Sequence, residues 1–414
     1  MFHFYRYIKP DEYRLAPGDA THPQMKLPDF RTVPKEYWGQ LHWQEDYRTE
    51  AAMLVDAGFQ LWKRGYLWQP GTEALPAALV DDLEDNYRFV RTWFGPRWAA
   101  YLLWLRWREG ETLAQERAAW RATKSAGQMP LSPMGYDPGH LPAQFAPSVS
   151  VIITSRNRPG HLRAVLGDLL VQSLAPSQVV VVDQSVEPIA VPEGVDYHHR
   201  PDLVGQWSGR NAAVALATGD FLAFVDDDVR LPRHWLQRHF QVLLGTQCQV
   251  STGLYVPKGS VPKPASPYYA SQWNANNSVM RRSVWEQVGP FDTAYDGTRW
   301  GDHAFGMAAY QAGFVLVQNP LAVVEDQAAT HGGLREGDEP SYRAYRIGQR
   351  PQVARGVQRY FATYFGAAAY RRWCHTRLPW QGRGGLGLVM RLFWYWLKIA
   401  LGHGPKPLPQ DSVG

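Results

Sequence analysis

Cysteine is scarce in this sequence, with only Cys248 and Cys374 among 414 residues. Two cysteines so far apart form neither a disulfide framework nor the paired spacing of a zinc site. A reduced, cytosolic compartment is therefore expected. Residues 1–15 also lack a charged start followed by an apolar core, so no signal peptide is predicted.

A strong net charge is absent too, because the formal charge is only +5. A balance this mild predicts no nucleic-acid partner. The charge is unevenly spread, however. From Ser341 onward there are twelve Lys or Arg residues and one acid, Asp411, so this tail carries +11 and the rest of the chain is acidic. A local basic surface of this kind favours an anionic partner.

The sequence has no long apolar run free of charge. The best candidate, residues 385–402, is 18 residues long but carries Arg391 near its middle and Lys398 on the same helix face. Its aromatic residues and the basic tail favour a helix lying on an anionic membrane surface, while packing on the protein stays an alternative. The expected location is cytoplasmic, with peripheral attachment to the inner face of the membrane.

The chain is predicted to have four parts. Residues 1–125 are expected to be helical and hold nine tryptophans, whose faces suit either helix packing or sugar stacking. Residues 126–146 are rich in Pro and Gly and are typical of a connector. Residues 147–335 are expected to form the catalytic domain, and residues 336–414 a basic helical extension that contacts a membrane.

The third part alternates between strands and helices. Strands are predicted at 148–154, 178–183 and 221–228, with helices at 160–174 and 209–219. The second strand, "QVVVVD", is apolar throughout, as expected for a parallel strand covered on both faces. This order predicts an α/β fold built on a mostly parallel open sheet with helices on both faces, which binds ligands at the carboxyl ends of its strands.

Three predicted strands end in polar residues. Thr154 and Arg156 follow the first strand, Asp183 ends the second, and the run Asp226–Asp228 ends the third. Alternation along an extended chain would turn Asp226 and Asp228 to one side. Two carboxylates there favour a hard cation, Mg²⁺ or Mn²⁺, with positions left for phosphate oxygens. A solvated acidic turn is the alternative.

The ordered segments "PSVSVIITSRNRPGHL", "VVVVDQS", "GRNAAVALATGDFLAFVDDDV", "NNSVMRRSVWEQVGPFD" and "RWGDHAFGMAAYQAGF" resemble a family 2 glycosyltransferase. The resemblance covers residues 148–335 and implies the A-type glycosyltransferase fold (GT-A). It also implies a nucleotide-binding set: Thr154, Arg156, Asp183, Arg210, Asp226 and Asp227. In this set Asp183 would bind the base and Asp227 the ribose.

The same resemblance implies a metal site at Asp226 and Asp228, with His331 as an added ligand. Asp302 matches the family's catalytic base, although a surface helix cap is the competing interpretation. The family's usual Glu before that Asp is replaced by Gly301. A loop position without metal is the alternative for His331.

The segment "YYASQWNANNSVMRRSVW" matches the part that faces the donor and acceptor sugars. Asn276 and Asn277 would bind sugar hydroxyls, and Trp300 would stack on an acceptor ring. A structural role is equally compatible with each of these three residues.

These features predict a metal-dependent, inverting glycosyltransferase. It would move a sugar from a UDP- or dTDP-linked donor to a hydroxyl of a glycan or lipid-linked acceptor. One alternative is an inactive sugar-binding or scaffolding protein on the same fold. A nucleotidyltransferase is disfavoured, because the loop "TSRNRPGHL" has one glycine where such enzymes need a glycine-rich phosphate loop.

Overall fold

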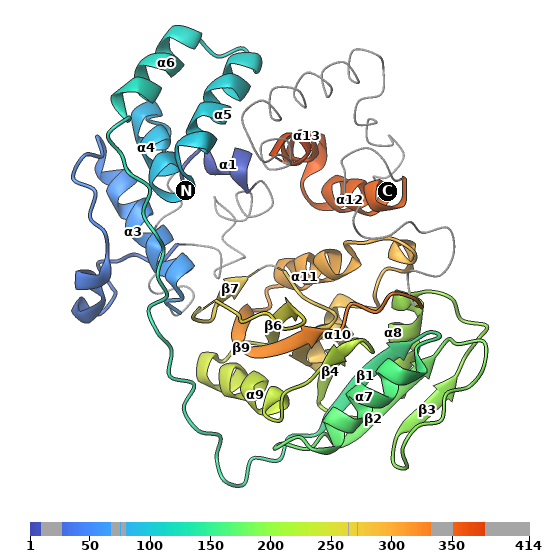
Figure 1. The fold of residues 1–414 in the computed structure, drawn as a ribbon. Helices are drawn as coiled ribbons and strands as arrows, with labels where there is room; N and C mark the ends of the chain where they lie inside the picture. The colour runs from blue at the N-terminus through green and yellow to red at the C-terminus, as the bar shows by residue number, and fades with distance from the viewer. Residues whose placement is uncertain are drawn as a thin grey trace. The chain divides into compact units, whose positions relative to one another are not determined.

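The computed structural model describes residues 1–9, 27–67, 75, 80–263, 265–270, 272–332 and 351–376. They divide into two compact units (Figure 1). One unit contains the described residues up to Met134 and those from Phe361 onward. The other runs from Gly135 through the sheet and includes Pro351–Tyr360.

The first unit is helical, as predicted. It contains α1 (Tyr5–Ile8), η2 (Lys35–Gln40), α3 (Glu50–Arg64), α4 (Leu83–Phe94), α5 (Pro96–Arg108), α6 (Leu113–Ala122) and α13 (Gly366–Thr376). Local sequence explains the ends of α3, because the Thr49 hydroxyl accepts a hydrogen bond from the Ala52 amide and Gly65 stops the helix at φ 93°. Pro96 begins α5 at a position where its missing N–H costs nothing.

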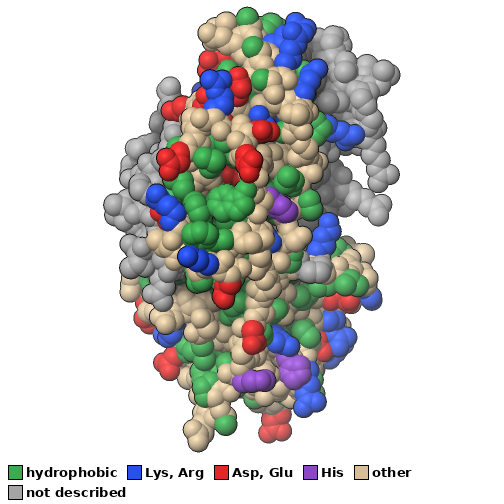
Figure 2. All heavy atoms as spheres, turned by 90° about the vertical axis from the view of Figure 1, so that its left-hand side faces the viewer, with side chains coloured by type: hydrophobic (Ala, Val, Ile, Leu, Met, Phe, Trp, Pro, Cys, Tyr) green, Lys and Arg blue, Asp and Glu red, His purple; other side chains and the backbone are tan. Residues whose placement is uncertain are grey.

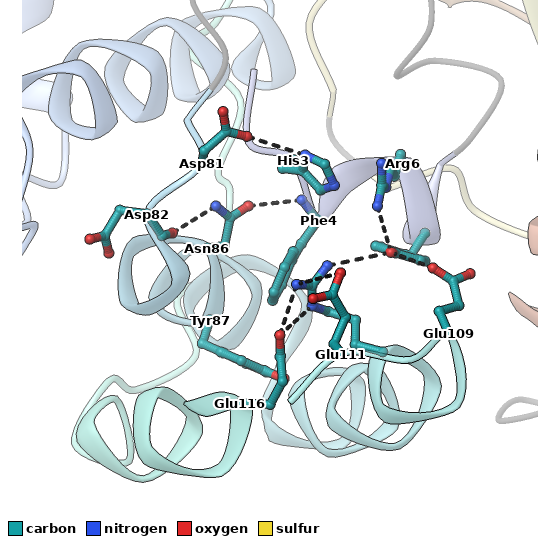
Figure 3. A network of polar contacts seen from close by, with 12 residues as sticks. His3, Phe4, Arg6, Asp81, Asp82, Asn86, Tyr87, Glu109, Glu111 and Glu116 are labelled. Carbon is teal, nitrogen blue, oxygen red and sulfur yellow. Dashed lines mark hydrogen bonds and ion pairs between the residues drawn. The ribbon is translucent and has the colours of Figure 1, made fainter. Parts of the chain in front are cut away.

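A buried polar network joins three helices and the first residues of this unit (Figure 3). Arg106 and Glu116 form an ion pair at 2.8 Å, and the Tyr87 hydroxyl donates to the same carboxylate at 2.6 Å. Asn86 accepts from the Phe4 amide at 2.8 Å. Because each of these buried groups is paired, the network stabilises one arrangement of α4, α5 and α6.

The tryptophans of this unit divide between packing and exposure. Trp62, Trp93 and Trp98 are buried, so the helix-packing interpretation holds for them. Trp43 and Trp107 keep 46% and 50% of their surface exposed. Figure 2 shows hydrophobic side chains gathered among charged ones on one face of the molecule.

The second unit is built on a nine-stranded sheet with the order β3-β2-β1-β4-β8-β6-β9-β5, and β7 pairs with β9. The strands are β1 (Val149–Ser155), β2 (Gln178–Asp183), β3 (Asp196–His199), β4 (Phe221–Val225), β5 (Val229–Arg230), β6 (Val250–Pro257), β7 (Tyr268–Ala270), β8 (Asn277–Arg281) and β9 (Leu316–Asp326). The α/β prediction is confirmed.

The sheet is mixed, not mostly parallel. Strands β3, β2, β1 and β4 run parallel to one another, as the alternating pattern predicted for β1, β2 and β4. Strand β8 then pairs antiparallel with both β4 and β6. The sequence-based expectation missed this reversal because it placed no strand at 277–281. The parallel half still brings the carboxyl ends of β1, β2 and β4 to one edge.

Helices cover the sheet on both faces. They are α7 (Pro159–Leu170), α8 (Gln206–Leu216), α9 (Trp235–Thr246), α10 (Arg282–Val288) and α11 (Gly301–Gln311), with the short turn η3 (Thr293–Tyr295). A further helix, α12 (Pro351–Tyr364), packs through Tyr360 on Trp300. Alternate residues of β4 face opposite layers: Phe221 packs on Phe240 of α9, whereas Phe224 packs on Trp273 and Phe291.

The predicted connector, residues 126–146, is attached to both units. The Met129 and Met134 amides bond to carbonyls of the helical unit, and Arg64 donates to the Ser132 carbonyl. Farther along, Gln241 of α9 donates to the Gly139 carbonyl and Phe145 packs on Phe240. This segment is thus an ordered connector in the structure.

The apolar tail segment 385–402 lies outside the described residues. Among the residues that the structure does describe, no helix has the length and apolar character needed to span a membrane.

Candidate functional site

The three consecutive aspartates lie in a turn. Strand β4 ends at Val225, and Asp226–Asp228 connect it to the short strand β5. The alternation expected for an extended chain therefore does not govern their side chains. Asp226 keeps 32% of its side chain exposed, whereas Asp227 and Asp228 are buried. The turn separates Asp226 from the other two.

Arg158, at the start of α7, is the partner of the buried pair. Its Nη1 lies 2.7 Å from Asp227 Oδ1 and 3.1 Å from Asp228 Oδ2. Asp227 also accepts from the Ser155 hydroxyl at 2.7 Å. Burial raises the pKa of Asp227 to about 6, and the charge of Arg158 opposes that rise. Both oxygens of Asp227, the expected ribose ligand, are therefore in use.

Arg210, on α8, lies beside Asp226. Its Nη2 donates to Asp226 Oδ1 at 2.6 Å, and its side chain is almost fully buried. The Nη1 of Arg210 is also buried and has no hydrogen-bond partner among the described residues. A buried guanidinium nitrogen without an acceptor is costly unless a ligand supplies one. This nitrogen is thus an open donor next to a carboxylate.

Asp302 lies in the first turn of α11 and belongs to the same charge cluster. The pKa of Asp226 is raised mainly by burial and in part by the negative charge of Asp302. Burial acts on Asp302 as well, but His303 and Arg210 outweigh it, so the pKa of Asp302 is lowered. The amide and Nδ1 of His303 both lie 2.9 Å from Asp302 Oδ1. Its Oδ2 accepts no hydrogen bond from the described residues.

The glycine that replaces the expected glutamate has a structural reason. A Cβ atom at Gly301 would lie 2.4 Å from Cε2 of the Trp207 ring. Trp207 is 2% exposed, and its ring packs on Phe291 and under the Arg210 guanidinium. The indole therefore fills the space at this helix start, and no side chain fits there.

The loops after β1 and β2 are joined. The Asn157 amide donates to the Ser185 hydroxyl at 2.6 Å, and the Asn157 side chain accepts from the Val186 amide at 3.1 Å. Asn157 has φ 56°, a left-handed conformation that asparagine tolerates better than most residues. Thr154 and Arg156, the predicted nucleoside contacts, precede this junction and are half-buried.

Asp183, the predicted base ligand, is fully buried. Its Oδ1 accepts from the amide and hydroxyl of Ser185, and its Oδ2 accepts from the Tyr197 hydroxyl at 2.6 Å. Burial, together with this bond, raises the pKa of Tyr197 to about 12. The nucleobase of a bound nucleotide could reach Asp183 only by replacing one of these hydrogen-bond donors.

Asn277 lies in the core. Its Oδ1 accepts from Trp235 and His239, and its Nδ2 donates to the carbonyls of Leu254 and Ala322. With no exposed surface and all these bonds made, it has no polar atom left for a sugar.

The other two predicted sugar contacts differ from Asn277. Asn276 is half-buried, and its Oδ1 has no partner among the described residues. Trp300 is 8% exposed and packs on His303 and Tyr360, with ring centroids 4.4 Å and 5.0 Å away. Asn276 thus offers an open acceptor, while little of the Trp300 ring is open for stacking.

His331 follows β9 and has an exposed side chain. Its Nδ1 lies 3.4 Å from the Thr330 hydroxyl, and its backbone carbonyl accepts from Arg158 Nε at 2.9 Å. Within the described ranges, no three His, Cys, Asp or Glu side chains converge as a ready-made metal cluster.

Sequence reasoning missed several residues that organise this site. Arg158, Tyr197 and Trp207 all contact predicted site residues. Arg158 is the last residue of the stretch "TSRNR", but no spacing rule distinguishes it from Arg156. Its role follows from contacts between distant segments, which a local pattern does not contain.

Comparison with known proteins gives matches in the sheet unit. The pattern of Glycosyl transferase family 2 matches residues 150–296. Two curated relatives, each a pre-mycofactocin glycosyltransferase from Mycobacterium tuberculosis (strains CDC 1551 / Oshkosh and ATCC 25618 / H37Rv), are 36% identical over 117 residues. That alignment covers 27% of this chain and 23% of each relative, so the chain matches less than a quarter of their length.

Solved structures similar to this chain include S. aureus TarS. The match is 18% identical and covers 43% of this chain and 36% of TarS, with a TM-score of 0.35. TarS 1–349 in complex with UDP matches with the same identity and TM-score and is covered to 60%. The family match spans strands β1 to β8 and includes the aspartate turn. Residues 150–296 of this chain thus carry the sequence pattern of Glycosyl transferase family 2.

Proposed function

We propose that this protein is a metal-dependent, inverting glycosyltransferase. It transfers a sugar from a nucleoside-diphosphate sugar, with UDP or dTDP favoured, to a hydroxyl of a glycan or lipid-linked acceptor. The observation that carries the proposal is the buried Nη1 of Arg210 beside Asp226, which has no hydrogen-bond partner in the part of the chain that the structure describes. A phosphate oxygen is the acceptor such a guanidinium binds best.

Asp302 is the proposed base. Transfer forms a bond between the acceptor oxygen and the anomeric carbon, breaks the bond to the diphosphate, and releases the hydroxyl proton. A lowered pKa keeps Asp302 ionised at neutral pH, and its Oδ2 is open to accept that proton. His303 holds the other oxygen and thereby orients the carboxylate. Attack opposite the leaving group inverts the anomeric carbon.

The charge of the cluster supports a divalent cation. The four carboxylates and two guanidinium groups of the cluster sum to a charge of −2 (Asp226, Asp227, Asp228, Asp302, Arg158 and Arg210). Mg²⁺ is usually held by one or two carboxylates together with substrate phosphates, and Mn²⁺ accepts the same oxygen ligands. Asp226 and Asp228 would hold it, with His331 as a third ligand. When bound, the ion would neutralise charge on the departing diphosphate.

A thermal-shift panel tests the donor class. UDP, dTDP, GDP and ADP are each added with MnCl₂, with MgCl₂ or with EDTA. We expect UDP or dTDP with metal to raise the melting temperature, since a ligand at 100 times its Kd stabilises by about 2.7 kcal/mol. EDTA should abolish the shift. No shift with any nucleotide would refute the proposal.

Asp302→Asn separates catalysis from binding. The variant should keep the nucleotide shift and lose about 10²–10⁴-fold in turnover, the usual contribution of a positioned base. Asp202→Asn is the matched control, because Asp202 is a surface acid that pairs only with Arg200 in a local ion pair. Full turnover in Asp302→Asn would remove Asp302 from the role. Nucleotide binding without transfer in the wild type would favour a sugar-binding protein without catalytic activity.

Peripheral attachment to the inner face of the membrane is part of the proposal. It is supported by the excess of basic residues from Ser341 onward in the sequence. Flotation with anionic liposomes tests it: the intact protein should float, and a chain lacking residues 385–414 should not. Failure of the intact protein to float would exclude this attachment.

A further inference from the structure

Arg158 connects the aspartate turn to a loop that is distant in the sequence. Besides its contacts with Asp227 and Asp228, its Nε donates to the His331 carbonyl at 2.9 Å and its Nη2 donates to the Gly332 carbonyl at 3.1 Å. The side chain is 7% exposed. One buried guanidinium thus bonds two carboxylates on one side and two backbone carbonyls on the other.

The loop fits closely against the chain around Arg158. Gly332 has φ 74°, and a Cβ atom there would lie 2.5 Å from the Arg156 carbonyl oxygen and 2.6 Å from Arg158 Cγ. A backbone oxygen cannot move aside as the end of a flexible side chain can. Only glycine therefore allows this approach, which is independent of the hydrogen bonds themselves.

The planar fork of arginine explains both sets of contacts. The three guanidinium nitrogens lie in one plane and together make four contacts, two with carboxylates and two with backbone carbonyls. A lysine ammonium would keep the charge next to Asp227 and Asp228, but it could not also reach two carbonyls on the opposite side. Charge compensation and loop attachment are therefore separable by substitution.

We propose that Arg158 is a positioning residue that fastens the turn His331–Gly332 over the aspartate turn and so sets where the His331 side chain stands. The inference rests on the proposed function, because it assigns this position to the binding of metal and nucleotide. Loss of the guanidinium releases the turn, and the position of the His331 imidazole is then no longer fixed by the backbone.

A spin label on the loop tests the attachment without any ligand. The label is placed at Thr330→Cys, which is exposed, in a chain that carries Cys374→Ser; Cys248 is fully buried. We expect Arg158→Lys and Arg158→Gln to increase label mobility. Arg163→Gln, an exposed arginine on the same helix α7, is the matched control and should leave the spectrum unchanged.

Nucleotide binding tests the consequence. In Arg158→Lys the apparent Kd for UDP in the presence of MnCl₂ should rise at least about tenfold. Rescue of loop immobility by lysine would overturn the inference, because charge alone would then suffice. If Arg158→Lys fails to fold, Gly332→Ala replaces it as the test variant, because this substitution disturbs the loop and leaves every charge in place. A spin label that stays immobile in Gly332→Ala overturns the inference.

The two proposals fail in different ways. A wild-type protein that binds no nucleotide refutes the proposed function, and the label spectra still decide whether Arg158 holds the loop. Binding that stays intact in a variant with a mobile loop overturns the functional half of the inference and leaves the proposed function standing.

Discussion

Replacement of Asn277 by alanine distinguishes a structural role from a sugar-binding one. Sequence reasoning placed this residue at the sugars, while the structure surrounds it with Trp235, His239 and the carbonyls of Leu254 and Ala322. If the amide is a structural element, its removal should destabilise the sheet unit and affect catalysis only through folding.

The size of the effect follows from the number of bonds. Four hydrogen bonds are lost, and each contributes about 1 kcal/mol net, so the direct loss is about 4 kcal/mol. The former hydrogen-bond partners of Asn277, left unsatisfied in the core, add to this loss of stability, because burial of an unsatisfied polar group costs about 1–3 kcal/mol. In a unit of this size 1 kcal/mol lowers Tm by about 2–4 °C. Asn277→Ala should therefore lower Tm by at least about 8 °C.

Differential scanning calorimetry measures this, and the neighbouring residue provides the control. Asn276 Oδ1 has no partner within the described part of the chain, so Asn276→Ala should change Tm by less than about 2 °C. If Asn276 contacts the donor sugar, that variant should instead raise KM. An Asn277→Ala variant with the Tm of the wild type and a raised KM would refute the structural assignment.

Three further variants have defined outcomes. Burial raises the pKa of the Asp56 carboxyl to about 7, above its usual 3.8. The folded state therefore binds the carboxyl proton more tightly than the unfolded state does, and the free energy of unfolding falls by about 4 kcal/mol as pH rises from about 4 to 7. Urea unfolding should show that dependence in the wild type and lose it in Asp56→Asn; equal slopes would contradict the assignment. Gly301→Ala should lower Tm by about 5 °C, since its methyl group would overlap Trp207, and an unchanged Tm would show that the ring can move. Tyr197→Phe frees one oxygen of Asp183, so calorimetric titration should show UDP binding about fivefold tighter if the base takes that place, and weaker binding would argue against it.

Local patterns in the sequence were sufficient for much of the scaffold. The glycine stop after α3 and the proline at the start of α5 fall where the structure has those ends. The β-branched runs that became β1, β2 and β4 were recognisable because strands covered on both faces are apolar throughout. The polar residues at their ends follow from the topology of a parallel sheet.

Other parts of the site depend on contacts that no local pattern contains. The pairing of β8 with β4 and β6 turns Asn277 into the core, although its sequence neighbourhood is polar. The turn at Asp226–Asp228 replaces strand alternation because the chain must reverse into β5 to pair with β9. Arg156 and Arg158 are the same residue type in one short stretch, so the sequence does not distinguish them. Their roles differ because the distant His331–Gly332 turn bonds to Arg158.

The bonds from Arg158 to His331 and Gly332 also bear on how the chain folds. They join residues 173 and 174 positions apart, and strand β9, which ends at Asp326, must be in place before the second half of the contact exists. Contacts of such sequence separation form late, after shorter loops have closed. Nascent chains and folding intermediates would therefore contain the aspartate turn before the His331–Gly332 turn is bonded to Arg158. Recovery of nucleotide binding during refolding should then lag behind recovery of the helical circular dichroism signal.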